Sequence, residues 1–212
     1  MARPKKEDEK DIPTLAVAVA QRLLEEGGQA QVTMAQVADA VGCSAPALYT
    51  HFRNRDALLR AVHDAGFEQL LRDKLAVAVR TQGDSFARLR EGGLAYMAFA
   101  LENPALYRLM FNPPPLPELE GNPFSGDVGL RSLELLENAV KAAQADGFLP
   151  DDEPAQIAFT LWSLVHGAAS LMIQNRAPLT GCDPARTGRE VVDTAMRLIA
   201  STRSKGTRYR TP

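Results

Sequence analysis

The chain has 212 residues, of which 45% are hydrophobic and 24% are charged, and its formal net charge at pH 7 is −2. This length suits one large domain or two small ones that share a core, and the composition is ordinary for a soluble globular protein. With a net charge near zero, overall basicity gives no indication of nucleic-acid binding. Evidence for such binding must come from local geometry. The two cysteines, Cys43 and Cys182, have no CxxC partner, which argues against a disulfide framework or a cysteine-rich zinc site.

The N-terminal region carries no pattern of a signal peptide. Its first eleven residues mix acidic and basic side chains, and the apolar run at 15–20 ends at Gln21. We find no stretch that approaches the ~18 apolar residues a membrane span requires. We therefore expect a cytoplasmic protein with no membrane partner.

Residues 1–11 are charged and aperiodic, which predicts a flexible N-terminal arm. Its basic residues could touch DNA, but the acids that follow offset them and equally fit a solvated terminus. A first helix is expected from about Pro13 to a point before Gly27. Its buried face is predicted to consist of Leu15, Val19, Ala20 and Leu23.

Residues 33–59 predict a helix, a tight turn, a second helix and the start of a third. Thr33 followed by Gln36 forms a capping box at the start of the first of these helices. Gly42 stands where a residue in the left-handed conformation ends a helix at little cost. Ser44 is expected to cap the second helix. Two short helices joined by a glycine-containing turn form a helix-turn-helix.

The outer face of the second helix suits the major groove of DNA. Leu48 and Phe52, four residues apart, form its buried face, and no acidic residue lies between Gly42 and Arg55. Hydroxyl and basic side chains on the other face can contact phosphates. For His51 and Arg53 the alternative is a solvated loop without a DNA contact. The predicted DNA-binding residues are Thr33, Ser44, Ala45, Pro46, Tyr49, Thr50, His51, Arg53 and Arg55.

At this motif the chain resembles the TetR/AcrR family of transcriptional regulators, over about residues 12–65. The matching pattern is Thr33-(x)3-Val37-Ala38-(x)3-Gly42-(x)-Ser44-(x)3-Leu48-Tyr49-(x)2-Phe52-(x)-Asn54-Arg55-(x)2-Leu58, and its leucine-tyrosine-x-x-phenylalanine part is the most specific. The family often has valine at the position of Cys43 and lysine at that of Arg55, where arginine keeps the charge for a phosphate contact. Ala45-Pro46-Ala47 fills a variable place, so the resemblance does not specify an operator sequence.

Apolar residues at helical spacing continue beyond the motif and predict a long helix over 56–81. Further helices are predicted at 84–102, 105–111, 127–146, 154–175 and 184–201. Prolines at 113–123 predict a stiff extended connection. No segment alternates with a period of two, so we predict an all-α fold of about nine helices.

The predicted domain organisation has four parts. They are a flexible arm (1–11), a helix-turn-helix DNA-binding domain (12–58), a helical ligand-binding and dimerisation domain (59–201) and a basic disordered tail (202–212). Within the third part, Gly92 and Gly93 each cost about 1 kcal/mol relative to alanine, which indicates close helix approach or room for a ligand. The last helix is predicted to turn Val191, Ala195 and Leu198 inward.

Two further segments extend the resemblance to one TetR subgroup. Trp162-x-x-x-His166-Gly167 resembles its tryptophan–histidine–glycine motif, and residues 103–111 resemble its other marked segment. His166 is either a core histidine bonded to a neighbouring helix or a polar group in a ligand pocket. The predicted ligand-binding residues, for which core packing is the alternative role, are Met97, Leu101, Tyr107, Phe111, Trp162, Val165 and His166.

No signature of catalysis is present. The three histidines, His51, His63 and His166, lie in separate segments, and the sequence contains no HExxH, GxSxG, P-loop or GxGxxG pattern. We therefore predict a protein that is not an enzyme, with no catalytic residues, no metal site and no cofactor.

The resemblance implies a ligand-responsive regulator, usually a repressor, that binds a palindromic double-stranded DNA operator as a homodimer through its last two long helices. A small-molecule effector among the helices after Gly83 would tilt the 56–81 helix and change the ~34–36 Å spacing of the recognition helices. The alternative is a helical small-molecule-binding or catalytic protein whose helix-turn-helix is vestigial. A third interpretation is an architectural DNA-bending protein.

Overall fold

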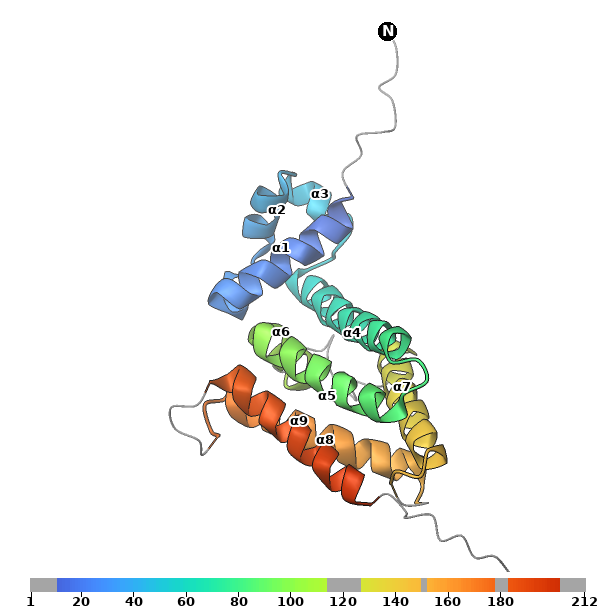
Figure 1. Ribbon diagram of the computed structural model, residues 1–212. Coiled ribbons are helices and arrows are strands. Elements are labelled where there is room, and N and C mark those ends of the chain that lie inside the picture. The colour runs from blue at the N-terminus through green and yellow to red at the C-terminus, as the bar shows by residue number, and fades with distance from the viewer. Residues whose placement is uncertain (1–10, 114–126, 150–151, 178–182, 203–212) are drawn as a thin grey trace, which may run out of the picture. The chain divides into compact units, whose positions relative to one another are not determined.

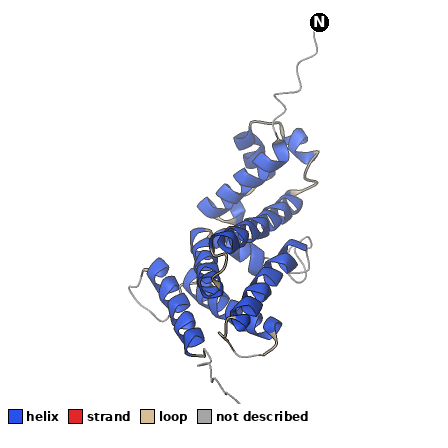
Figure 2. Cartoon of the chain, turned by 45° about the vertical axis from the view of Figure 1, so that its right-hand side comes forward, coloured by secondary structure: helices blue, strands red, loops and turns tan. Residues whose placement is uncertain are grey.

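The computed structural model describes residues 11–113, 127–149, 152–177 and 183–202. Every regular element among these residues is helical, as Figure 1 and Figure 2 show. The predicted all-α fold class is therefore confirmed. Most of the predicted N-terminal arm, proline-rich connection and basic tail lies outside the described residues.

The described residues divide into two compact units. The first contains the chain up to Phe67 together with helix α6 (Pro104–Phe111), and the second contains Glu68–Asn103 and the described residues from Asp127 onward. Helix α4 (Arg55–Arg80) therefore contributes its first half to one unit and its second half to the other. The predicted boundary after residue 58 differs from this division, because it assigns α6 to the C-terminal domain.

The first unit is built around helix α1. Its elements are α1 (Ile12–Gly27), a 3-10 turn η1 (Gln29–Gln31), α2 (Met34–Val41), α3 (Ala45–Tyr49), the first half of α4, and α6. Helix α1 packs against α2, α3 and α6. Each of the three elements that follow α1 is too short to be stable alone, so α1 supplies the surface on which they fold.

Helix α1 buries a different face from the predicted one. Its buried residues are Ala16, Ala20 and Leu24, whereas Leu15 is 41% exposed and Val19 and Leu23 are partly exposed. The two stripes lie one residue apart, and the alanines of the buried one let neighbouring helices come closer to the α1 axis. Of the four predicted residues, only Ala20 lies in the core.

Helix α6 is fastened to α1 by Glu25. The Glu25 carboxylate accepts hydrogen bonds from the backbone N–H groups of Ala105 at 3.0 Å and Leu106 at 2.7 Å. Such first-turn N–H groups have no partner within their own helix, and a negative charge near a helix N-terminus is favourable. Leu106, Leu109 and Met110 are fully buried. These contacts explain why α6 belongs to the first unit.

Helices α4 and α6 also meet through aromatic rings. The Phe67 ring centroid lies 5.1 Å from that of His63 and 5.4 Å from that of Phe111. A Cβ atom on Gly66 would lie 2.6 Å from the sulfur of Met110, so the glycine permits this close approach. The first half of α4 is thereby packed into the same core as α6.

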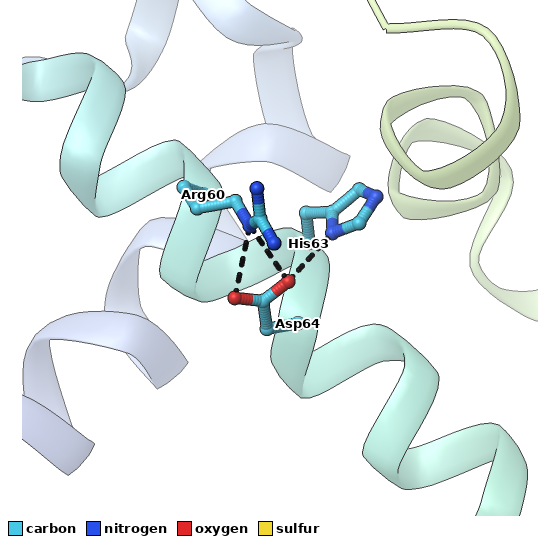
Figure 3. Close-up of polar contacts among 3 residues, drawn as sticks. All are labelled: Arg60, His63 and Asp64. Atoms are coloured by element: carbon cyan, nitrogen blue, oxygen red, sulfur yellow. Dashed lines mark hydrogen bonds and ion pairs between the residues drawn. The ribbon is translucent and has the colours of Figure 1, made fainter. Parts of the chain in front are cut away.

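Figure 3 shows three polar residues on one turn of α4. Arg60 Nε donates to both carboxylate oxygens of Asp64, at 2.9 and 3.0 Å, and His63 Nδ1 lies 2.9 Å from Asp64 Oδ1. Burial alone would raise the pKa of Asp64, but the hydrogen bonds from His63 and Arg60 lower it below its ordinary value. The carboxylate therefore stays ionised and supports the helix as an i,i+4 partner of Arg60.

The second unit is organised around helix α5 (Ser85–Glu102). Its other elements are the second half of α4, α7 (Asp127–Ala145), α8 (Pro154–Ile173) and α9 (Pro184–Ser201). Helix α5 packs against α7, α8 and α9, and Figure 1 shows it alongside α9. The Asp84 and Asp183 side chains cap α5 and α9 by accepting hydrogen bonds from backbone N–H groups of the first turn.

Helix α9 carries two apolar stripes, and the one that faces its own unit is not the predicted one. The buried residues are Val192, Met196 and Ile199. Of the predicted inward residues, Val191 and Ala195 are partly exposed and Leu198 is 63% exposed. The stripes again lie one residue apart, so periodicity alone does not separate them.

Helix α8 leaves much of its apolar surface uncovered. It is the one helix among the described residues that is long and apolar enough to cross a membrane, and only 17% of its most apolar window is buried. Phe159, Leu164 and Leu171 are 57%, 39% and 47% exposed. By length and composition, α8 therefore contradicts the expectation that no stretch approaches a membrane span. The residues between its apolar side chains are small or uncharged, so they do not interrupt the apolar run.

The Glu25 contact generates a stability prediction. Replacing Glu25 by alanine should lower the free energy of unfolding by about 1–3 kcal/mol, because two helix N–H groups lose a charged acceptor. Glu26→Ala is the matched control, since Glu26 is exposed and pairs only with Arg22 on the same helix, which is worth about 0.5 kcal/mol or less. Urea denaturation measures both, and equal losses would contradict the role assigned to Glu25.

Candidate DNA interface and ligand cavity

The helix-turn-helix is held by hydrogen bonds at each end of α2. Thr33 Oγ1 accepts the backbone N–H of Gln36 at 3.2 Å and donates to Gln36 Oε1 at 2.7 Å, so the capping box closes through the threonine hydroxyl. Gly42 has a φ of 73°, in the left-handed region. The backbone N–H of Gly42 donates to the carbonyl of Asp39 at 3.0 Å. The backbone N–H of Cys43 donates to the carbonyl of Ala38, also at 3.0 Å. This pattern is the Schellman motif, so the predicted end of α2 is confirmed.

Helix α3 begins after the predicted cap Ser44 and ends at Tyr49, before Phe52. Ser44 Oγ accepts the N–H of Ala47 at 3.3 Å, and Asn54 Oδ1 accepts that of Ala57 at 2.8 Å, which caps α4. Leu48 is fully buried and Phe52 is 8% exposed, as the predicted inner face requires. The opposite side of α3 therefore faces away from the core.

Most of the predicted DNA-binding residues lie on α3 or in the segment that follows it, and they are exposed. Tyr49, on α3, is 51% exposed, which is unusual for so large a side chain. The Thr50 hydroxyl donates to the carbonyl of Ala47 at 2.6 Å, so its oxygen remains as an acceptor. The exposed members of the predicted set are Thr33, Ser44, Pro46, Tyr49, Thr50, His51 and Arg53, and Ala45 is partly exposed.

Arg55 differs from the predicted phosphate contact. Its Nε donates to the carbonyl of Val32 at 2.7 Å and its Nη2 to that of Gln29 at 2.5 Å. The remaining amine lies 3.8 Å from Asp56. The planar guanidinium thus ties the start of α4 to the segment before α2, a role that needs its fixed fork of donors. Sequence reasoning missed this role because the partners are backbone carbonyls.

The second unit contains a cavity of about 130 Å³ between α5 and the surrounding helices. Its walls come from α4, α5, α7, α8 and α9 and are mostly apolar. Trp162 and Val165, two of the predicted ligand-binding residues, line it. Small molecules bind in such spaces, where apolar walls carry a few polar groups.

The other predicted ligand-binding residues lie elsewhere. Met97 is buried. Met97 and Leu101 both pack close to Gly188 of α9, where an added Cβ atom would lie 3.0 Å from the Met97 methyl. Tyr107 and Phe111 belong to the first unit, where their ring centroids are 4.8 Å apart. None of these four lines the cavity.

His166 stands just behind the cavity wall in a hydrogen-bonded group. Its Nδ1 lies 2.9 Å from the hydroxyl of Tyr96, which also accepts the indole N–H of Trp162 at 3.2 Å. The hydroxyl accepts from the indole, and its own proton suits an Nδ1 that is unprotonated. Desolvation lowers the pKa of His166, which agrees with a neutral ring. Tyr96 itself lines the cavity.

Two cationic residues in the cavity wall escaped the sequence analysis. Lys74, on α4, and Arg88, on α5, both line it. A signal was present, since Lys74 lies four residues after Leu70 and three before Val77, which places a charge on a buried apolar stripe. Among the residues that the structure describes, no three histidine, cysteine or acidic side chains are grouped as metal ligands would be.

Both parts of the chain match known families. Residues 16–62 match the family described as bacterial regulatory proteins, tetR family, and residues 89–195 match the tetracyclin repressor-like C-terminal domain. The chain belongs to the TetR family. It is therefore a helix-turn-helix transcription regulator, as its N-terminal motif predicts.

The individual proteins that this TetR-family chain resembles share about a third of its residues or fewer over the matched segments. It is 34% identical over 97 residues to the nucleoid occlusion factor SlmA of Edwardsiella ictaluri, a match that covers 44% of this chain and 46% of SlmA, under half of either. A solved protein of unknown function from Rhodococcus sp. RHA1 is 26% identical, with 93% of this chain and 100% of that chain covered and a TM-score of 0.75.

A TetR variant from Acinetobacter baumannii, solved in complex with minocycline, shares the fold. It is 19% identical to this chain, covers 90% of it and 97% of its own length, and has a TM-score of 0.59. At this identity the likeness concerns the fold alone.

The adjacent glycines of α5 generate a matched prediction in this TetR-family unit. A Cβ on Gly92 would meet no atom within 4 Å, whereas one on Gly93 would lie 3.2 and 3.3 Å from the Val192 methyls. Gly92→Ala should raise the free energy of unfolding by about 1 kcal/mol through helix propensity, and Gly93→Ala should gain less. Thermal and urea unfolding measure both, and equal gains would refute close packing at Gly93.

Proposed function

We propose that this TetR-family regulator is a repressor that binds a palindromic DNA operator as a homodimer and is released by a small-molecule effector. The observation that carries the DNA-binding half is the outer face of α3, where Tyr49 projects from a segment without acidic residues. The minocycline complex of the structurally similar TetR variant supports the effector half, since that protein holds a small molecule.

On this proposal α3 lies in the major groove. Tyr49 and Ser44 donate to phosphates and set the register, while Ala45 and Pro46 meet base edges. Thr50, His51 and Arg53 follow the backbone beyond the helix. Arg55 acts indirectly by holding the start of α4 against the segment before α2.

A second copy of the chain would cover the exposed faces of α8 and α9. Leu164, Gly167 and Leu171 follow one another at helical spacing on α8, and Gly167 has open space where a side chain would stand. Leu198 adds the uncovered stripe of α9. Two such helix pairs form a four-helix bundle whose apolar seam explains the composition of α8 without a membrane.

Effector binding would reach the DNA-binding unit along two continuous segments. The second half of α4 lines the cavity, and its first half belongs to the other unit. Helix α5 also lines the cavity and is followed directly by α6, which Glu25 fastens to α1. A ligand that displaces α4 and α5 would change the spacing of two recognition helices, with a coupling of typically ~1–3 kcal/mol.

Further features belong to the same proposal. On this proposal the chain belongs to the TetR subgroup whose tryptophan–histidine–glycine motif Trp162-x-x-x-His166-Gly167 resembles. The protein acts in the cytoplasm, where its operator is accessible, and performs no catalysis. The predicted N-terminal arm and basic tail can add backbone contacts to DNA.

The DNA interface is tested at Tyr49. Tyr49→Ala should weaken binding to operator and random DNA alike, by roughly fivefold to tenfold, since one phosphate hydrogen bond is lost. Changes at Ala45 or Pro46 should instead alter which operator is preferred. Gel-shift titration with the DNA flanking the gene measures both. An unchanged affinity for Tyr49→Ala, in a protein of unchanged stability, would contradict this placement of α3.

The dimer face is tested by charge insertion. Leu171→Glu or Leu198→Glu should convert a dimer to monomers, because a carboxylate would be buried in an apolar seam without a partner. Val79→Glu is the control, since Val79 is 76% exposed on α4, outside the proposed interface. Sedimentation equilibrium reports the mass, and a dimer that survives both α8 and α9 substitutions would place the interface elsewhere.

A further inference from the structure

One polar group in the cavity wall has no partner within the protein. The Nε–H of Arg88 is buried and makes no hydrogen bond, alone among the buried side-chain nitrogens and oxygens of the described residues. Leaving a buried donor unsatisfied costs about 1–3 kcal/mol, so such a group in a folded protein requires an explanation. Because Arg88 also lines the cavity, a small reorientation of its guanidinium would let a molecule inside the cavity supply the missing acceptor.

A second cation in the same wall also lacks a counter-charge. The Lys74 Nζ donates to the backbone carbonyl of Ser132 at 3.1 Å and to its hydroxyl at 2.7 Å, and no described carboxylate forms an ion pair with it. The residue as a whole is partly exposed, but its amine is surrounded by protein, and this desolvation lowers its pKa to about 8. Two neutral acceptors leave the positive charge uncompensated.

The remaining walls bound the size and polarity of a ligand. Leu89, Trp162, Val165 and Met196 contribute apolar surface, and Gly92 leaves space where any other residue would place a side chain. The volume of about 130 Å³ is close to that of a dry engineered cavity of ~150 Å³ that accommodates benzene. The space therefore suits one aromatic ring or a short aliphatic chain.

We propose that the cavity binds a small organic carboxylate with an apolar body, whose carboxylate accepts from Arg88 and lies in the field of Lys74. This assignment rests on the proposed effector-responsive function and names the chemical class of the effector. A carboxylate supplies both the missing acceptor and the missing negative charge, whereas a neutral ligand supplies only the acceptor. Hydrogen bonds between charged groups are also the stronger kind in a site of low polarity.

The test compares carboxylates with their neutral amides on the full chain. Isothermal titration calorimetry uses benzoate, phenylacetate, 3-phenylpropionate and hexanoate, each beside benzamide, phenylacetamide, 3-phenylpropionamide and hexanamide. At least one carboxylate should bind at least about tenfold more tightly than its amide, because the amide leaves both cations uncompensated.

Three variants locate the preference in the cavity. Arg88→Met and Lys74→Met keep an unbranched stem without the charge, and each should reduce the preference for carboxylate over amide by about tenfold. Arg131→Met, on the exposed side of α7, removes an equal charge away from the cavity and should change nothing. Lys74→Met should also unfold at a temperature at or above that of the wild type, because a desolvated amine is removed. That readout separates loss of binding from loss of fold.

Three results would overturn the carboxylate assignment. These are equal binding of acid and amide, wild-type carboxylate affinity in both cavity variants, and no binding by any member of the panel. A gel shift on the same protein keeps the two proposals apart. Operator binding without a carboxylate preference would defeat only the ligand class, whereas carboxylate binding by a protein that recognises no DNA would defeat the regulatory function.

Discussion

A helix of five residues does not hold itself together, and that constraint governs the DNA-binding unit of this protein. Helix α3 forms only because Ser44 caps its start, Leu48 is buried beneath it, and the loop that follows is anchored at both ends. The Arg55 guanidinium completes the arrangement by joining α4 to the backbone carbonyls ahead of α2. The exposed position of Tyr49 is thus a product of packing on the opposite side of the helix. Any change that loosens this packing alters the DNA-binding surface without touching a residue in it.

The second unit depends on two adjacent glycines of α5 that act in opposite ways. Gly93 lets α9 approach until only hydrogen atoms fit between them, and Gly92 leaves its neighbourhood empty. Helical geometry turns neighbouring residues about 100° apart, so only Gly93 meets α9, although both glycines line the cavity. Close helix approach therefore holds for Gly93, and room for a ligand stays a prediction. A single helix thereby joins the scaffold of the unit to the wall of its cavity.

Charge is treated differently in the two units. The Glu25 carboxylate meets two unpaired N–H groups at the start of α6 and is fully used by the fold. The Lys74 amine is desolvated and the Arg88 Nε–H is buried without a hydrogen bond, and both conditions lower stability. Sites kept in an unfavourable state are typically functional ones, where stability is given up for binding. The contrast separates a charge that the fold itself satisfies from polar groups that the fold leaves unsatisfied.

The sequence by itself predicted most helix limits to within a few residues, several of their caps, the left-handed turn at Gly42 and the family resemblance, because each depends on residues a few positions apart. It could not decide between stripes one residue apart on α1 and α9, since both are apolar and only the neighbouring helices distinguish them. Tertiary structure alone assigned α6 to the first unit, buried Tyr107 there against Phe111, and placed Lys74 and Arg88 in a cavity wall. Those outcomes depend on contacts between residues distant in the chain, which no local pattern encodes.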